Sequence, residues 1–354
     1  MKTMCSRFMK AYPIAVGLIA FLLFPQAIKA QGTAQTFTQE QLKEYFNNRP
    51  KSDKWMDPTG KYQVVMEVDP TLEGHTIYHP VDLSAFPKKD KLPVVLMSGP
   101  GCDDDGDSFR PFWTEIASHG YMVIATGEPV PEGVRAAMGA TTEEDMKAGL
   151  DWIISENERP GSKYYQKVDT EHIALFGQSC GGVQALKLSG DPRVSLLGLW
   201  NSGLGAMADN ADPARSSLMG ISPALKEMLI NLRIPIAYFV GDTDPARPNS
   251  AMDYDNIKSN VSVVLAVREI PGDAHGGTFR EKNGGSFGQV GVAWLDWQFK
   301  HSKKAAKVFK SSKSFLFTEK KWVEVKTKNL LVFQYPLLVL FKCCFAFLQL
   351  VLTG

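Results

Sequence analysis

Short apolar runs alternate with amphipathic stretches through most of this chain, and this alternation constrains the fold more than any other feature. The apolar runs end at turn residues, as buried strands do. Buried strands that alternate with helices form a mainly parallel sheet that helices cover on both faces. Strands are expected at residues 63–68, 75–78, 93–97, 121–125, 173–176, 194–200, 236–240 and 263–270, and helices at 109–119, 141–156, 182–188, 223–232 and 287–299. The sequence therefore predicts an α/β fold.

The N-terminus is typical of an export signal. Positive charges precede an uncharged apolar run at residues 13–25, and Ala30 offers a small residue for cleavage. We therefore expect residues 1–30 to be a signal peptide and residues 31–60 to be a polar lead-in. Export predicts a secreted or extracytoplasmic protein, in a compartment where disulfides can form.

The C-terminus, residues 302–354, is lysine-rich at first and then apolar. The stretch at residues 330–352 is long enough to span a bilayer, but Lys342 interrupts it. After export, the preceding lysines would lie outside the cytoplasm, against the usual charge rule. A peripheral tail is favoured over a membrane anchor, and membrane contact through this tail stays an open alternative.

The net charge and the length of the chain limit which kinds of molecule it is expected to bind. Lysine and arginine number 39 against 38 acidic residues, so the formal net charge is only +1. A nucleic acid or another polyanion would require a basic field, so neither is expected as a partner. The 354 residues suffice for one large domain, and five cysteines are too few for a disulfide scaffold. A small or neutral substrate is therefore predicted.

A Gly-x-Ser-x-Gly pattern at residues 177–181 places Ser179 between an expected strand and an expected helix. A serine in this pattern occupies a sharp, strained turn, and the glycines let neighbouring backbone pass closely. The helix behind it directs its positive end at a developing oxyanion. The pattern predicts a nucleophilic Ser179 at the carboxyl edge of the sheet, where ligands bind in folds of this class.

A serine nucleophile needs a base and an acid, which follow it along the chain in sites of this kind. Of the six histidines, only His275 and His301 come after Ser179. His275 lies in a glycine-rich loop directly after a strand, whereas His301 ends a helix among lysines, so His275 is the predicted base. Asp242 and Asp244 both follow an expected strand, and Asp244 is favoured because the turn takes up the nearer aspartate.

Two backbone N–H groups should face the substrate oxygen in such a site. Cys180, directly after the nucleophile, supplies one of them, and Cys102 supplies the other, with Gly101 as the alternative. Trp200 and Asn201 end a strand at the same edge and are candidate substrate-binding residues. Core packing is an equal alternative for Trp200.

Cys102 and Cys180 are also candidates for a disulfide. Two N–H groups that bond one oxygen at about 2.9 Å have nitrogens only about 5 Å apart, which is compatible with the Cα separation of a bridge. Export permits the bond, and the bond would fix the two oxyanion donors. Side chains that diverge around the substrate would argue against it.

Ser179, Asp244 and His275, in this order, and the Gly-Gln-Ser-Cys-Gly-Gly turn resemble the α/β-hydrolase superfamily. The Pro-Gly-Cys turn at residues 100–102 and the paired glycines resemble secreted polyester hydrolases, cutinases, chlorophyllases and dienelactone hydrolases. Cysteine at both oxyanion positions departs from the polyester hydrolases, where bulkier side chains are usual. The resemblance implies an α/β-hydrolase fold and no cofactor.

The resemblance covers roughly residues 64–301, and the catalytic domain is expected over residues 61–301. It implies a serine esterase that cleaves small-molecule or polymeric carboxylic esters through an acyl-enzyme. A serine peptidase of the same fold and a non-catalytic binding module on a hydrolase scaffold are the alternatives. The aspartate-rich loop at residues 103–107 lacks the remaining ligands of a calcium loop, so no metal is expected.

Overall fold

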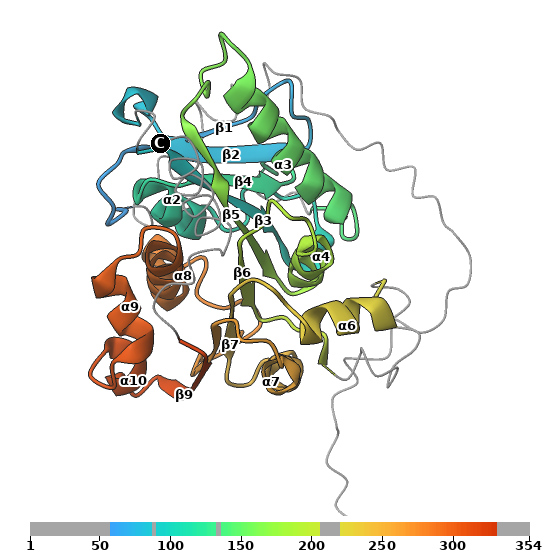
Figure 1. The fold of residues 1–354 in the computed structure, drawn as a ribbon, viewed down its shortest axis with the longest axis vertical. Helices are drawn as coiled ribbons and strands as arrows, with labels where there is room; N and C mark the ends of the chain where they lie inside the picture. The colour runs from blue at the N-terminus through green and yellow to red at the C-terminus, as the bar shows by residue number, and fades with distance from the viewer. Residues whose placement is uncertain (1–56, 87–89, 132–135, 206–219, 331–354) are drawn as a thin grey trace, which may run out of the picture. The chain divides into compact units, whose positions relative to one another are not determined.

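A nine-stranded sheet organises the part of the chain that the structure describes, residues 57–86, 90–131, 136–205 and 220–330 (Figure 1). The structure is a computed structural model. The expected signal peptide at residues 1–30, most of the lead-in and the apolar tail fall outside these ranges. Within them, no helix is long and apolar enough to cross a membrane.

The sheet is parallel in its centre and antiparallel at both edges. Its strands are β1 (Val64–Glu67), β2 (His75–Pro80), β3 (Leu92–Ser98), β4 (Met122–Thr126), β5 (Val168–Gln178), β6 (Leu196–Trp200), β7 (Ile236–Gly241), β8 (Val263–Arg268) and β9 (Trp322–Lys328). They lie in the order β1-β2-β4-β3-β5-β6-β7-β8-β9, and neighbours from β4 to β8 pair in parallel. β2 pairs antiparallel with β1 and β4, and β9 pairs antiparallel with β8. The predicted mostly parallel sheet is confirmed.

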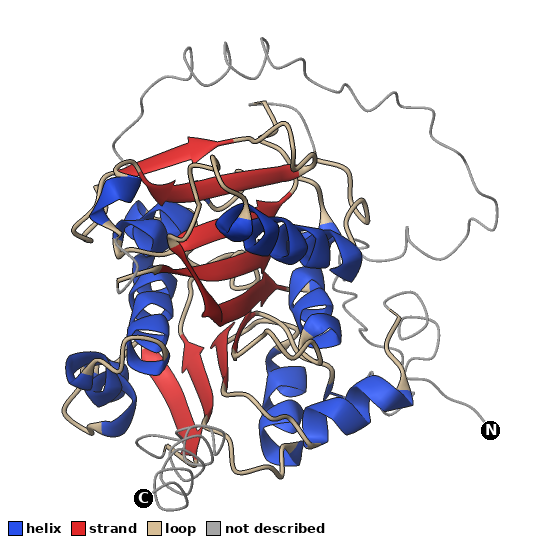
Figure 2. Ribbon diagram, turned by 45° about the horizontal axis from the view of Figure 1, so that its top comes forward, coloured by secondary structure: helices blue, strands red, loops and turns tan. Residues whose placement is uncertain are grey.

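Helices cover both faces of the sheet (Figure 2). One face carries α2 (Arg110–Ser118), α8 (Gly285–Gln298), α9 (Lys303–Lys310) and α10 (Phe315–Thr318), and the other carries α3 (Glu143–Glu158), α4 (Cys180–Leu188), α6 (Pro223–Ile230) and α7 (Arg247–Asn256). Along β7, Ile236 and Tyr238 face one core, and Ala237 and Phe239 face the other, because successive strand side chains point to opposite faces. The predicted α/β layering is therefore confirmed.

The start of α3 follows from its sequence. The Thr142 side chain accepts a hydrogen bond from the Glu144 backbone, and the Asp145 carboxylate accepts one from the Thr142 backbone at 2.6 Å. This reciprocal pair is a capping box, and the acidic first turn also suits the positive end of the helix dipole. The predicted helix at residues 141–156 is confirmed within two residues at each end.

The domain extends beyond its predicted boundary at residue 301. α9, α10 and β9 all follow that boundary, and β9 pairs with β8 along its length. β9 was not among the predicted strands, because lysine and glutamate side chains interrupt its apolar pattern, as is common in edge strands. α7 was not predicted either, because it is largely polar and buries only Ser250, Asp253 and Tyr254.

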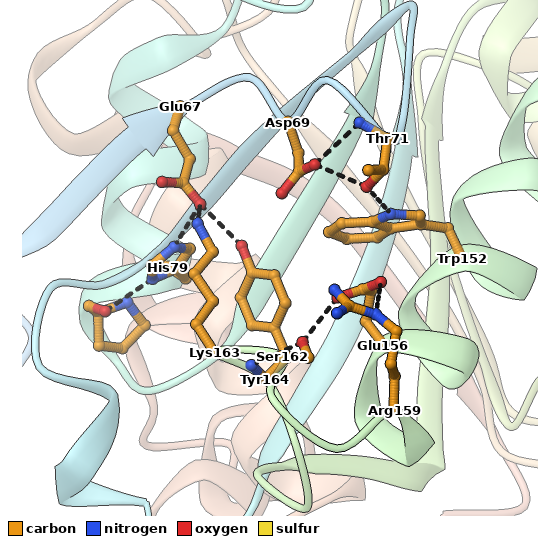
Figure 3. Close-up of polar contacts among 11 residues, drawn as sticks. Glu67, Asp69, Thr71, His79, Trp152, Glu156, Arg159, Ser162, Lys163 and Tyr164 are labelled. Carbon is orange, nitrogen blue, oxygen red and sulfur yellow. Dashed lines mark hydrogen bonds and ion pairs between the residues drawn. The ribbon is translucent and has the colours of Figure 1, made fainter.

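A polar cluster joins the antiparallel edge of the sheet to the segment before β5 (Figure 3). The Glu67 carboxylate accepts hydrogen bonds from His79 Nε2 at 2.9 Å, from the Tyr164 hydroxyl at 2.7 Å and from the Lys163 ammonium. We call these four residues the Glu67 cluster. Burial raises the pKa of Glu67, but the three donors lower it more, so the pKa falls from 4.5 to about 2. Glu67 therefore stays charged near neutral pH and ties together two distant segments.

Candidate active site

Ser179, Asp244 and His275 come together at the carboxyl ends of three strands. Ser179 follows β5, Asp244 lies in the turn after β7, and His275 lies in the loop after β8. Ser179 Oγ is 2.9 Å from His275 Nε2, and His275 Nδ1 is 2.7 Å from Asp244 Oδ2. The three residues therefore form one hydrogen-bonded series, in the order that the sequence predicts.

The direction of these hydrogen bonds follows from the carboxylate. A carboxylate only accepts, so the neutral ring of His275 donates from Nδ1 and leaves Nε2 to accept the Ser179 hydroxyl proton. The Ala246 backbone N–H donates to the other oxygen of Asp244 at 2.5 Å. The side chain of Asp244 is fully buried, whereas that of His275 is 41% exposed. The predicted base is therefore accessible while its carboxylate partner is shielded from water.

Asp242 and His301, the alternative acid and base, lie outside the hydrogen-bonded series that joins Ser179, His275 and Asp244. Asp242 Oδ1 accepts a hydrogen bond from the Ile270 backbone N–H at 3.1 Å, so this aspartate supports the turn after β7. His301 is exposed in the connection between α8 and α9. The structure thus brings Asp244 and His275 to Ser179, rather than Asp242 and His301.

A tight turn presents Ser179 at the end of β5. Its φ of 54° lies in the left-handed region, which is strained for serine. A Cβ atom on Gly177 would lie 2.3 Å from the Gly181 carbonyl oxygen, and one on Gly181 would lie 2.2 Å from the Ser98 carbonyl oxygen. The Ser179 N–H donates to the Trp200 carbonyl at 3.1 Å, which ties the turn to β6. Close backbone approach therefore explains the glycines of the pattern.

A disulfide joins the two residues that the sequence assigns to the oxyanion site. Cys102 and Cys180 are bonded, with their Cα atoms 5.2 Å apart. Cys102 ends the 3-10 turn Pro100–Cys102, and Cys180 begins α4, where no carbonyl of the helix accepts its N–H. The Gly181 N–H donates to the Gly99 carbonyl at 3.1 Å and ties the same two segments again. The bridge, for which the sequence left both outcomes open, is therefore present.

Acidic residues follow the Cys102 turn. Burial, with help from the charges of Asp105 and Asp104, raises the pKa of Asp103 from 3.8 to about 6, although the Asp105 backbone N–H and Arg280 act in the opposite direction. Below this pH the carboxyl next to Cys102 is mostly neutral.

The described ranges contain no group of three or more histidine, cysteine or acidic side chains arranged to hold a metal ion.

Comparison with known proteins adds no family to these observations. No protein-family model and no curated protein matches this chain. The site is therefore interpreted from its own geometry.

Trp200 does not line the site. Its side chain is fully buried, and the rings of Phe112, Phe176 and Phe239 lie with centroids 5.3, 4.6 and 5.3 Å away. The alternation of β6 directs this ring into the core that α2 and α8 cover. Substrate binding by Trp200 is therefore wrong, and core packing, the alternative, is confirmed. The contribution of Trp200 to the site is its backbone carbonyl, which accepts the Ser179 N–H.

Asn201 is also buried, but its side chain contacts two loops of the site. Its Oδ1 accepts from the Gly241 N–H at 2.9 Å, and its Nδ2 donates to the carbonyls of Ala274 at 3.2 Å and His275 at 2.8 Å. Because Asn201 is only 1% exposed, the prediction that it binds substrate is wrong. Gln178, which was not among the predicted site residues, donates to the same His275 carbonyl at 2.8 Å. Only its place inside the Gly-x-Ser-x-Gly pattern could have indicated this residue.

Proposed function

We propose that this chain is a serine hydrolase of the α/β-hydrolase fold that cleaves carboxylic esters. The observation that carries the proposal is the series Ser179–His275–Asp244, with contacts of 2.9 and 2.7 Å, at the carboxyl edge of the parallel strands. Acyl transfer uses a serine on a strained turn, a histidine that removes its proton, and a carboxylate that orients the histidine.

The proposed reaction proceeds through an acyl-enzyme. His275 Nε2 takes the Ser179 proton while Ser179 Oγ attacks the ester carbonyl, and Asp244 stabilises the imidazolium that forms. The backbone N–H groups of Cys102 and Cys180 stabilise the oxyanion. The imidazolium then protonates the alcohol oxygen as its bond to the carbonyl carbon breaks. The alcohol departs, and the acyl group remains on the serine. Water, deprotonated by His275, releases the acid and restores the serine hydroxyl.

Chain order and the disulfide support the assignment of fold and compartment. The nucleophile after β5, the acid after β7 and the base after β8 follow the order Ser, Asp, His, which is the order in α/β-hydrolases. The Cys102–Cys180 bond supports export, because such bonds persist in oxidising compartments. The proposed substrate is a neutral small-molecule or polymeric ester, and the steps above need no cofactor.

Replacement of the nucleophile tests the proposal. The wild type should hydrolyse p-nitrophenyl esters and react with a fluorophosphonate serine probe, and Ser179→Ala should do neither. Ser195→Ala is the matched control, because this serine directly precedes β6, at the end of that strand away from Ser179, and its hydroxyl donates to the Ile173 carbonyl. Labelling that persists in Ser179→Ala would place the nucleophile elsewhere. Faster cleavage of aminoacyl anilides than of esters would favour the peptidase alternative.

A further inference from the structure

Two buried amide side chains hold the backbone of the proposed catalytic base. The His275 carbonyl accepts one hydrogen bond from Gln178 Nε2 and one from Asn201 Nδ2, each at 2.8 Å. Both amide side chains belong to residues that are 1% exposed, so neither can contact a substrate. Gln178 ends β5 and Asn201 follows β6. Two central strands of the sheet therefore fix one peptide group in the loop after β8.

The loop that carries His275 is rich in glycine. Gly272 and Gly277 have φ values of 85° and 64°, and Gly276 lies between them and next to His275. The His275 side chain is 41% exposed, so packing covers only part of it. A glycine-rich loop can adopt many backbone conformations unless specific contacts select one. The two amide hydrogen bonds supply such contacts.

Asn201 also connects this loop to the loop of the proposed acid. Its Oδ1 accepts the N–H of Gly241, the last residue of β7 and the start of the turn that carries Asp244. One side chain therefore links the backbones that present His275 and Asp244. The φ of Asn201 is 48°, a left-handed conformation that asparagine adopts more readily than most residues.

One polar atom of Gln178 is unfavourable for folding, which argues against a purely structural role. Its Oε1 is buried and has no hydrogen-bond partner in the described part of the chain. A buried acceptor without a partner destabilises a fold relative to an apolar group of the same shape. Methionine has nearly the shape of glutamine and would remove this acceptor. A residue kept only for packing would therefore be better served by methionine.

We infer that Gln178 and Asn201 are positioning residues that set the turnover rate through the backbone of His275. This inference rests on the proposed function, in which His275 must meet the Ser179 hydroxyl. A displacement of about 1 Å in a reacting group can lower a rate about 100-fold. Because neither side chain meets the substrate, their loss should lower kcat and leave KM nearly unchanged.

Three variants test the inference. Asn201→Gly removes every side-chain contact without straining the left-handed backbone, and Gln178→Met removes the donor while keeping the shape. Asn157→Gly is the matched control, since Asn157 is also buried and accepts the Val168 N–H at 2.9 Å, at the other end of β5. For each variant we would measure kcat, KM, the thermal midpoint and the rate of fluorophosphonate labelling at Ser179.

The expected results separate positioning from stability. Asn201→Gly should lower kcat and the labelling rate about 100-fold, and Gln178→Met about 10-fold with an unchanged or raised thermal midpoint. Asn157→Gly should lower the midpoint and leave kcat intact. A kcat within about twofold of wild type in both site variants overturns this inference alone. A wild type without Ser179-dependent turnover overturns the proposed function, and the inference with it.

Discussion

His275 and His79 each hold a carboxylate at hydrogen-bond distance, but their second ring nitrogens face different partners. His275 Nδ1 lies 2.7 Å from Asp244, and His79 Nε2 lies 2.9 Å from Glu67. The other nitrogen of His275 faces the Ser179 hydroxyl, whereas that of His79 lies 2.7 Å from the Pro80 carbonyl. The His79 side chain is 4% exposed, against 41% for His275.

The difference indicates which feature of a histidine–carboxylate pair the proposed reaction would use. Both nitrogens of His79 lie at hydrogen-bond distance from oxygens of the fold, Glu67 on one side and the Pro80 carbonyl on the other. No nitrogen of His79 is left for a substrate or a nucleophile. His275 has the same kind of carboxylate partner but an accessible Nε2 beside a hydroxyl. A histidine that only pairs with a carboxylate is therefore expected to have a structural role. A histidine that also faces a hydroxyl group and is exposed to solvent is expected to have a catalytic role.

Replacing each histidine with alanine tests this difference most directly. His275→Ala should lower kcat by about 10⁵- to 10⁶-fold, because the serine loses its base. It should leave the stability to guanidinium almost unchanged, since the ring is partly exposed. His79→Ala should leave kcat intact and lower the free energy of unfolding by about 2 kcal/mol, because Glu67 loses a donor. Comparable losses of kcat in both variants would contradict the comparison.

The acid side of the site offers the next largest effect. Asp244→Asn should lower kcat by about 10⁴-fold, because the amide no longer selects the tautomer that accepts the serine proton. Asp242→Asn should change kcat far less, since Asp242 contacts the Ile270 backbone instead of the histidine. Steady-state kinetics on one p-nitrophenyl ester compares the two directly. The reverse ranking would exchange their assignments.

Of the two regions, only the candidate active site contains a disulfide, so a reducing agent should affect it and not the Glu67 cluster. Reduction should lower kcat by about 10- to 100-fold, because the two oxyanion donors lose their fixed separation. The Glu67 cluster contains no cysteine, so reduction should leave its hydrogen bonds in place. The double variant Cys102→Ala with Cys180→Ala should show the same lower kcat and no response to dithiothreitol. A wild type whose kcat is unchanged after thiols are shown to be free would refute the role of the bond.

The smallest expected effect concerns acid stability. The pKa of Glu67 is about 2 in the folded protein and 4.5 ordinarily, so its carboxylate stabilises the fold fully above pH 4.5. That stabilisation, about 2 kcal/mol, is lost as the pH falls from 4.5 towards 2. Glu67→Gln should flatten this part of the stability profile in denaturant titrations. An unchanged profile would show that the cluster does not contribute to acid sensitivity.

Much of the site could be predicted because its parts are local in sequence. The pattern around Ser179 and the positions of Asp244 and His275 after strands depend on short segments and on chain order. The face that the ring of Trp200 occupies could not be predicted, because a strand buried on both faces has apolar residues at every position and its sequence does not show which face each one meets. The contact between Asn201 and the His275 backbone joins residues from different loops, and no local pattern encodes it.

The fold shows the same division. Strands with uninterrupted apolar runs, such as β7 (Ile236–Gly241), were predicted almost to the residue. β9 was missed because its partly exposed side chains follow no apolar run, and only its pairing with β8 defines it. The Glu67 cluster could not be predicted, because its hydrogen bonds connect residues that lie 96 and 97 positions apart.

β9 completes the sheet late in synthesis. A ribosome has added every residue of the Ser179–His275–Asp244 series by position 275, but the outer edge of β8 has no partner strand until residues 322–328 emerge. An apolar strand with an open edge is a template for pairing with another chain. The growing protein therefore passes through an interval in which two nascent copies can join edge to edge. Once in place, β9, with its two lysines and one glutamate, closes the sheet against such association.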